Sequence, residues 1–370
     1  MKNLAFRHAG FGVALAVMLS ACTGNGIGSV NTVPSANEAA FRFANGHPGP
    51  AGLLNDAGVV PVGLGRRGFE EIIDGLSAGF DRHRDAVTTG GIYAATVSGP
   101  PFETSTVYGY TNPNKRNHPW ICTLGTVPSF GNIDVDGRGN LIVPEGPIST
   151  VAVYQGPGMC GPKVSSLSDP YGEPLDASSA DALTSPIAVL NEFGPNGDPP
   201  GSISVCYALT YDSYCYENLT NPYLYQPGSV AFTNNCWAST LDQSGQPRLV
   251  YFSGCYGSGE LATGYLDSYV GGLDIDKAGN LVSVSLYSLY VYKGCNPACT
   301  LVGGPFSLHG ESGQAHLDKN SQHLVVDDAG NNTIDVYAYS PTSLTYLYSF
   351  NNGFQGQFTS GAAFNPRSKQ

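Results

Sequence analysis

Residues 272–294 read GLDIDKAGNLVSVSLYSLYVYKG, and residues 131–156 read GNIDVDGRGNLIVPEGPISTVAVYQG. Both stretches carry an Asp-x-Asp, a Gly-Asn, an apolar run and a Val-Tyr ending, in that order. The Asp-x-x-Gly-Asn part suits a hairpin turn, because Asp accepts hydrogen bonds from nearby backbone N–H groups and Gly adopts positive φ. The sequence therefore predicts the same strand–turn–strand unit at two distant places in one chain.

Looser copies of this unit recur along the chain. Their aromatic endings fall at Tyr110, Tyr154, Tyr207, Phe252, Tyr292 and Tyr337, spaced 40 to 53 residues apart. A period of this length with about four short strands per repeat is typical of β-propeller blades and not of helical solenoids. We predict an all-β, six-bladed β-propeller over residues 91–370.

The C-terminal strand is predicted to close the ring. The first blade begins near Gly91 and lacks an innermost strand, whereas the last apolar piece, Phe358–Phe364, has no blade after it. Placing that piece beside the first blade removes an exposed sheet edge.

The N-terminus resembles a bacterial lipoprotein signal peptide. A cationic start precedes a short apolar run that ends in Leu19-Ser20-Ala21-Cys22, and such a run is too short to cross a bilayer. The resemblance implies removal of residues 1–21, a palmitate-type lipid on Cys22, and anchoring in the cell envelope. Because Thr23 follows the cysteine, the resemblance favours anchoring in the outer membrane, with the folded domain in the periplasm or exposed at the cell surface. An ordinary secretory signal is the alternative.

Two further segments precede the repeats. Residues 22–37 are rich in Thr, Gly, Asn and Ser, which predicts a flexible tether. Residues 38–90 are expected to form an N-terminal extension with one short helix, because apolar residues recur there at helical spacing. They are Phe69, Ile72, Ile73, Leu76 and Phe80.

Cysteine usage agrees with export. Apart from Cys22 the chain has eight cysteines, and an even number outside the cytosol predicts disulfide bonds. Short spacing suggests the pairs Cys206–Cys215, Cys236–Cys255 and Cys295–Cys299, and elimination leaves Cys122–Cys160. A zinc site at Cys295 and Cys299 is the alternative for the third pair.

Charge excludes one class of partner. The chain has 17 Lys and Arg against 29 Asp and Glu, a net charge of −12, and it lacks the clustered cations that a nucleic-acid binder needs. The segment 211–227, YDSYCYENLTNPYLYQP, has more aromatic residues than packing requires. Its tyrosines form the predicted binding surface: Tyr211, Tyr214, Tyr216, Tyr223 and Tyr225.

Catalytic and metal-binding motifs are weak. Gly310-Glu311-Ser312-Gly313 lacks the last glycine of a nucleophile elbow. His309, His316 and His323 are expected on different strands and loops, and so not to share a metal with Asp327 and Asp328. The Asp-x-Asp-Gly loop could bind calcium, but it lacks the closing bidentate Glu. We therefore expect no catalytic residue, metal or cofactor.

The pattern D-x-x-G-N-L-x-V followed by x-V-x-V-Y resembles the NHL-repeat and gluconolactonase-like six-bladed propellers. The resemblance covers residues 91–366. It implies either binding of protein, sugar or nucleic acid, or lactonase activity with one divalent cation held by Glu, Asn and Asp oxygens at the tunnel mouth. No such ring of ligands can be assigned in this sequence. We predict a membrane-anchored binding or scaffolding propeller for a protein or glycan; the alternative is a divalent-metal-dependent, lactonase-like hydrolase that uses the tunnel.

Overall fold

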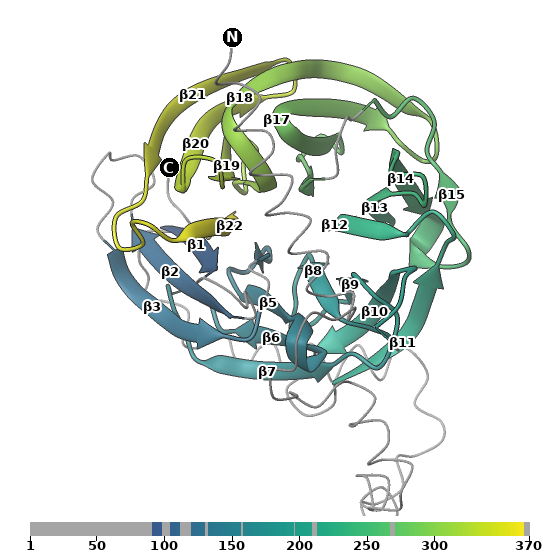
Figure 1. Ribbon diagram of the computed structural model, residues 1–370, viewed down its shortest axis with the longest axis horizontal. Helices are drawn as coiled ribbons and strands as arrows, with labels where there is room; N and C mark the ends of the chain where they lie inside the picture. Colours follow the sequence, from purple (N-terminus) through teal and green to yellow (C-terminus); the bar gives the residue numbers. More distant parts are fainter. Residues whose placement is uncertain are drawn as a thin grey trace, which may run out of the picture. The chain divides into compact units, whose positions relative to one another are not determined.

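The structure is a computed structural model, and it describes residues 91–97, 104–111, 120–129, 132–156, 158–195, 197–208, 213–266 and 271–365. The predicted signal peptide, Cys22, the tether and the short helix all lie outside the described residues. The described strands belong to one compact unit, Val87–Gly194 with Asp198–Gln370. In this unit antiparallel sheets follow one another around a ring (Figure 1).

The described strands form five sheets. Four sheets have four strands each, and their orders are β22-β1-β2-β3, β4-β5-β6-β7, β11-β10-β9-β8 and β12-β13-β14-β15. The fifth has six strands, β16-β17-β18-β19-β20-β21. The β-propeller fold is thus confirmed, but the strands do not separate into six individual sheets.

The strands of the first two sheets are short and follow the repeats. Those of the first sheet are β22 (Phe358–Phe364), β1 (Gly91–Val97), β2 (Ser105–Thr111) and β3 (Trp120–Val127). Those of the second are β4 (Asp134–Val135), β5 (Leu141–Glu145), β6 (Thr150–Tyr154) and β7 (Lys163–Ser168), with the 3-10 turn η3 (Gly146–Ile148) between β5 and β6.

The next two sheets repeat this design. The third contains β8 (Pro174–Ser178), β9 (Ile187–Asn191), β10 (Ser202–Ala208) and β11 (Ser213–Thr220). The fourth contains β12 (Gln226–Phe232), β13 (Cys236–Leu241), β14 (Pro247–Phe252) and β15 (Glu260–Leu261), with η4 (Ser253–Cys255) before β15.

The six-stranded sheet contains two unusually long strands. Its members are β16 (Leu273–Ile275), β17 (Leu281–Gly294), β18 (Cys299–Leu317), β19 (His323–Asp328), β20 (Thr333–Ser340) and β21 (Ser343–Phe350). The first part of β17 pairs with β16 and its last part with the start of β18, whereas the end of β18 pairs with β19. Register shifts near Leu286, which has a positive φ of 42°, interrupt the pairing of β17 with β18.

The predicted ring closure is confirmed. Strand β22 pairs with β1 in antiparallel register, with Phe364 opposite Ile92 and Phe358 opposite Val97. The last strand of the chain therefore completes the sheet begun by the first described strand, and β1 is paired on both sides.

The Asp-x-x-Gly-Asn segments form hairpin turns, as the sequence predicts. Oδ1 of Asp136 accepts hydrogen bonds from the backbone N–H groups of Arg138 and Asn140, and Oδ2 accepts one from the side chain of Asn140. Gly139 has a φ of 89°, which a residue with a Cβ atom rarely adopts. Asp276 makes the equivalent bonds in the turn between β16 and β17.

The buried apolar side chains of the described residues form six separate clusters. Five of them join consecutive sheets of the ring. The sixth lies within the six-stranded sheet, where Val284 and Val291 of β17 pack with Val326 and Tyr337 of β19 and β20. The two halves of that sheet therefore pack against each other as neighbouring sheets do elsewhere in the ring.

The expectation of disulfide bonds is also confirmed. The bonds join Cys122 to Cys160, Cys206 to Cys215, Cys236 to Cys255 and Cys295 to Cys299. Because Cys295 and Cys299 are bonded to each other, the alternative of a zinc site at this pair does not hold.

Candidate functional site

The innermost strands enclose a small polar cavity. Its volume is about 140 Å³, and residues at or beside the ends of β4, β8, β12, β16, β18 and β22 line it. Phe232 and Phe364 are among its apolar residues, and Asp134, Asp274 and His316 supply the ionisable groups. Typical small-molecule pockets measure about 300–1,000 Å³, so this cavity suits a few waters or a very small ligand.

His316 lies between the two carboxylates of the cavity. Its Nδ1 atom is 3.4 Å from Oδ1 of Asp134 and 3.8 Å from Oδ2 of Asp274, and its Nε2 atom is buried without a hydrogen-bond partner. Burial, together with the negative charge of Asp176, raises the pKa of Asp134 well above its ordinary value. Burial also raises the pKa of Asp274 to about 6.

The cavity residues do not fit the metal site that the gluconolactonase-like resemblance implies. Neither Glu nor Asn is among the described residues that line the cavity. In the described part of the chain, two groups of three residues bring their possible ligand atoms within 4.8 Å of one another. Asp134, Asp274 and His316 are not one of these groups.

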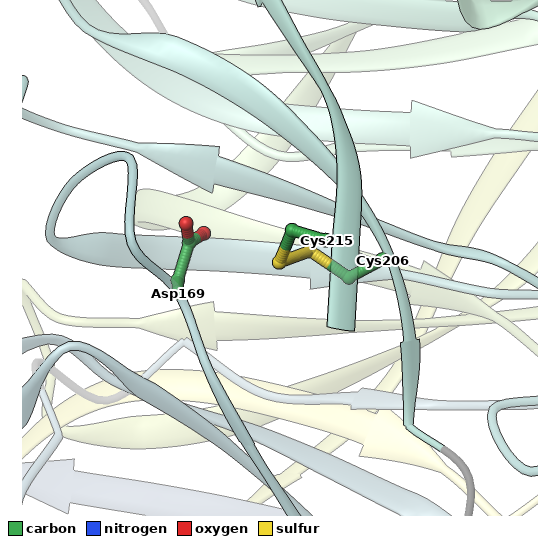
Figure 2. Close-up of side chains that lie close together, drawn as sticks. All are labelled: Asp169, Cys206 and Cys215. Atoms are coloured by element: carbon green, nitrogen blue, oxygen red, sulfur yellow. A yellow bond between two sulfur atoms is a disulfide. The ribbon is translucent and has the colours of Figure 1, made fainter. Parts of the chain in front are cut away.

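One of those two compact groups contains a disulfide. It consists of Asp169, Cys206 and Cys215, shown in Figure 2. Metals bind cysteine as the thiolate, and both sulfur atoms are bonded to each other here. While the disulfide is intact, this group is not a metal centre. The second group is His309, Asp328 and Asp335.

Part of the predicted tyrosine surface forms a cluster on the outer edge of the third sheet. Tyr214 and Tyr216 lie on β11, the outermost strand, and both are exposed. The ring of Tyr207 on β10 lies 5.8 Å from that of Tyr214 and 5.4 Å from that of Tyr216, which it stacks upon. Burial raises the pKa of Tyr216, and Tyr207 and Tyr256 raise it further. The side chain of Tyr256 is 59% exposed.

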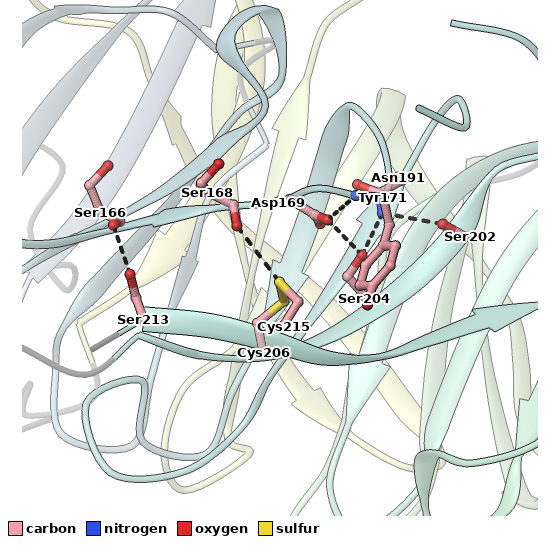
Figure 3. The surroundings of a disulfide bond; sticks show 10 residues. All are labelled: Ser166, Ser168, Asp169, Tyr171, Asn191, Ser202, Ser204, Cys206, Ser213 and Cys215. Carbon is pink, nitrogen blue, oxygen red and sulfur yellow. Dashed lines mark hydrogen bonds between the residues drawn. A yellow bond between two sulfur atoms is a disulfide. The ribbon is translucent and has the colours of Figure 1, made fainter. Parts of the chain in front are cut away.

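A β-bulge and a disulfide hold the cluster in place. Val205 pairs with Glu217 and Cys206 with Cys215, which leaves Tyr216 as the extra residue of the bulge. A bulge changes the direction of side chains on the bulged strand. Next to it, the disulfide joins β10 to β11, and Figure 3 shows the hydrogen bonds that surround it. The side chain of Ser213 donates one of these bonds to the carbonyl of Ser166 on β7.

The other predicted surface residues lie apart from this cluster. Tyr211 is outside the described residues. Tyr223 and Tyr225 follow the far end of β11; Tyr223 is exposed and Tyr225 is half-buried. The sequence argument did not include Tyr207 in this surface, because it counted that residue among the aromatic endings of the repeats. We name the cluster of Tyr207, Tyr214 and Tyr216 the tyrosine patch.

The histidines differ from expectation in one respect. His309 and His316 lie on the same strand, β18, and not on different strands as expected, whereas His323 begins β19. Each of the three has an aspartate neighbour. His309 lies beside Asp328 and Asp335, and the ring of His323 hydrogen-bonds with Asp318 at 2.8 Å. Strand β18 pairs with β19 of the β19–β20 hairpin, and this brings His309 close to Asp328. Ser312 is buried within β18 and is not held on a strand-to-helix turn.

Comparison with known proteins informs the fold alone. A chain of a nidogen/laminin complex matches with a TM-score of 0.53 and 11% identity, over 75% of this chain and 98% of that one. A hypothetical selenium-binding protein from Sulfolobus tokodaii matches with a TM-score of 0.50 and 10% identity, over 76% and 94%. The chain has a β-propeller fold.

The remaining comparisons identify no family. A periplasmic gluconolactonase from Pseudomonas aeruginosa matches with a TM-score of 0.48 and 13% identity, over 75% of this chain and 99% of that one. No protein-family model matches the chain, and no curated protein matches it. Among the described residues, no helix has both the length and the apolar character needed to cross a membrane.

Proposed function

We propose that this propeller is a binding module of the bacterial cell envelope and that its ligand docks on the tyrosine patch. The observation that carries this proposal is the pair of exposed rings of Tyr214 and Tyr216 on the edge strand β11, with the half-buried ring of Tyr207 on β10 stacked on Tyr216. Core packing does not require exposed aromatic rings, and a disulfide beside them lowers the entropy lost when a ligand orders the surface.

A neutral glycan fits the patch better than a charged polymer does. Tyrosine rings offer an apolar face and a hydroxyl at one end, so they can pack on the C–H face of a sugar and hydrogen-bond with its hydroxyl groups. The net charge of −12 disfavours acidic polymers. A protein ligand remains the other member of the predicted class, since tyrosine is also enriched at protein interfaces.

Binding to neutral polysaccharides tests the proposal. Wild-type protein should be retarded in native gels that contain a soluble neutral glycan, and a Tyr214→Ala, Tyr216→Ala double variant should not. Tyr223→Ala is the matched control, because its side chain is 39% exposed, close to the 42% and 36% of Tyr214 and Tyr216. Retardation of the double variant equal to that of the wild type would reject the patch as the binding site. If no neutral glycan in a broad panel retards the wild type, the glycan assignment fails.

We infer that the ring has six blades. Two observations support this count: the core has six clusters in succession around the ring, and residues of six innermost strand segments line the cavity. On this interpretation the six-stranded sheet consists of two blades. The boundary between them falls within β18, whose early residues pair with β17 and whose last residues pair with β19.

The cellular location of the protein is part of the same proposal. Four disulfides suit a compartment outside the reducing cytosol. The resemblance of residues 1–22 to a lipoprotein signal suggests that Cys22 carries the anchor and that the outer membrane holds it, with the propeller in the periplasm or at the cell surface.

The alternative function, a metal-dependent lactonase-like hydrolase, has less support. It requires cation ligands that meet in the tunnel, and the carboxylates of Asp134 and Asp274 do not form a compact group with His316. The cavity volume of about 140 Å³ is also small for a sugar lactone with its attacking water. We therefore favour binding over catalysis.

A further inference from the structure

Three metal-binding side chains meet far from the tyrosine patch, on the last strands of the six-stranded sheet. His309 belongs to β18, Asp328 ends β19, and Asp335 lies near the start of β20. The Nδ1 atom of His309 is 3.4 Å from Oδ2 of Asp335 and 3.7 Å from Oδ2 of Asp328. One ligand atom from each of the three residues lies within 4.8 Å of both others.

These separations are those of ligands around one small cation. A direct N–H···O hydrogen bond measures about 2.7–3.2 Å, so both distances are too long for it. Zinc binds imidazole nitrogen at about 2.0–2.1 Å and carboxylate oxygen at about 2.0–2.2 Å in a tetrahedral arrangement, which places two ligand atoms roughly 3.4 Å apart. The spacing of the imidazole to both carboxylates thus fits a shared ion as well as it fits an ion pair.

Neighbouring groups orient both carboxylates. The backbone N–H and the side-chain amide of Asn331 donate to Asp328. Thr333 and Ser349 donate their hydroxyls to Oδ1 of Asp335, and Tyr337 donates to its Oδ2 at 3.2 Å. Outer hydrogen bonds of this kind are characteristic of metal ligands, because they fix the orientation of each ligand before the ion binds.

The absence of a side chain at Gly310 leaves room for the Asp328 carboxylate. A Cβ atom at position 310 would lie only 2.1 Å from its Oδ1 atom, so the carboxylate occupies space that only a glycine leaves open. The imidazole of His309 is held in turn by stacking on Tyr346, with ring centroids 4.8 Å apart.

The carboxylates carry charge that the protein balances poorly. Asp328 and Asp335 are almost fully buried. Close by, Glu311 has its Oε2 atom buried without a hydrogen-bond partner. A buried pair of like charges is unfavourable unless a cation accompanies it. His309 is 52% exposed at its side chain, so an ion can reach the group from solvent.

We propose that His309, Asp328 and Asp335 bind one divalent cation of the zinc class. The imidazole nitrogen selects zinc over calcium or magnesium, which prefer oxygen ligands. Three protein ligands leave a fourth position for water or for an oxygen or nitrogen donor of a ligand. The ion links β18 to the β19–β20 hairpin, and thereby strengthens the sheet next to the closing strand.

Zinc titration of the full chain tests this site. Calorimetry on protein first treated with a chelator should show one more bound zinc per chain in the wild type than in His309→Gln, and zinc should raise the unfolding temperature of the wild type but not that of His309→Gln. The exposed position of His309 makes this substitution compatible with folding. His323→Gln is the matched control, because it removes a histidine that has an aspartate partner but is not part of the three-ligand group; it should keep the site.

A second variant separates ligation from general electrostatics. Ser349→Ala removes a hydroxyl that orients Asp335 but leaves all three ligands in place. It should weaken zinc binding by about tenfold, as loss of an outer partner does elsewhere. Equal zinc titrations for wild type and His309→Gln would overturn the proposal. So would calcium binding at these carboxylates that survives His309→Gln, because the imidazole would then play no part.

Discussion

Phe364 is the side chain through which the C-terminal strand closes the ring, and replacing it with alanine measures how much that closure contributes. The residue is 3% exposed and packs in a cluster that contains Ile92 and Tyr110 of the first sheet as well as Val325 and Val336 of the last. It therefore joins the two ends of the chain of sheets. Phe358 lies on the same strand but is 45% exposed, so Phe358→Ala is a control that keeps the strand and removes an equal volume.

The expected effect follows from burial. Replacing a buried Phe with Ala costs about 3–5 kcal/mol, whereas a surface substitution changes stability by about 0.5 kcal/mol or less. For a domain of this size each kcal/mol shifts the unfolding temperature by about 2–4 °C, so Phe364→Ala should lower it by roughly 6–20 °C. Phe358→Ala should leave it nearly unchanged.

Thermal and guanidinium unfolding without reductant, which keeps the disulfides intact, measures both variants. Equal midpoints for Phe364→Ala and Phe358→Ala would refute the argument, because β22 would then add no packing energy to the ring. A large loss in both variants would show that the exposed Phe358 is covered by a contact outside the described residues.

Three shorter predictions concern the anchor, one disulfide and pH. Cys22→Ser should release the protein from the membrane fraction; a variant that stays bound after a salt wash would place the anchor elsewhere. Replacing Cys206 and Cys215 with Ser should lower the free energy of unfolding by about 2–3 kcal/mol, given the short loop that the bond closes, and weaken glycan binding; unchanged binding would mean that the patch needs no cross-link. Burial raises the pKa of Asp327 to about 8, so the folded protein holds this proton more tightly than the unfolded chain does. The resulting stabilisation is complete below about pH 4 and is lost as the pH rises to about 8. Between about pH 5 and pH 9 the free energy of unfolding of Asp327→Asn should therefore fall less than that of the wild type. Equal losses in the two proteins would contradict the raised pKa of Asp327.

The sequence by itself determined those features that depend on neighbouring residues. The Asp-x-x-Gly-Asn turns form because one aspartate satisfies N–H groups two and four residues on, and this pattern is readable at 136–140 and 276–280 without any tertiary contact. The period of the aromatic endings and the unpaired apolar segment 358–364 together predicted a propeller closed by its last strand. Short spacing between cysteines likewise predicted local cross-links.

The tertiary structure alone decided which distant side chains converge. Tyr207 contacts the predicted Tyr214 and Tyr216 because a bulge opposite Val205 and Cys206 shifts the register of β11. No local sequence pattern encodes that shift. His309 meets Asp335 because the β19–β20 hairpin folds back beside β18. Turns and strand periods depend on the chemistry of a few adjacent residues, whereas the composition of a site depends on strand register and on packing between sheets, and both of these are set by the whole ring at once.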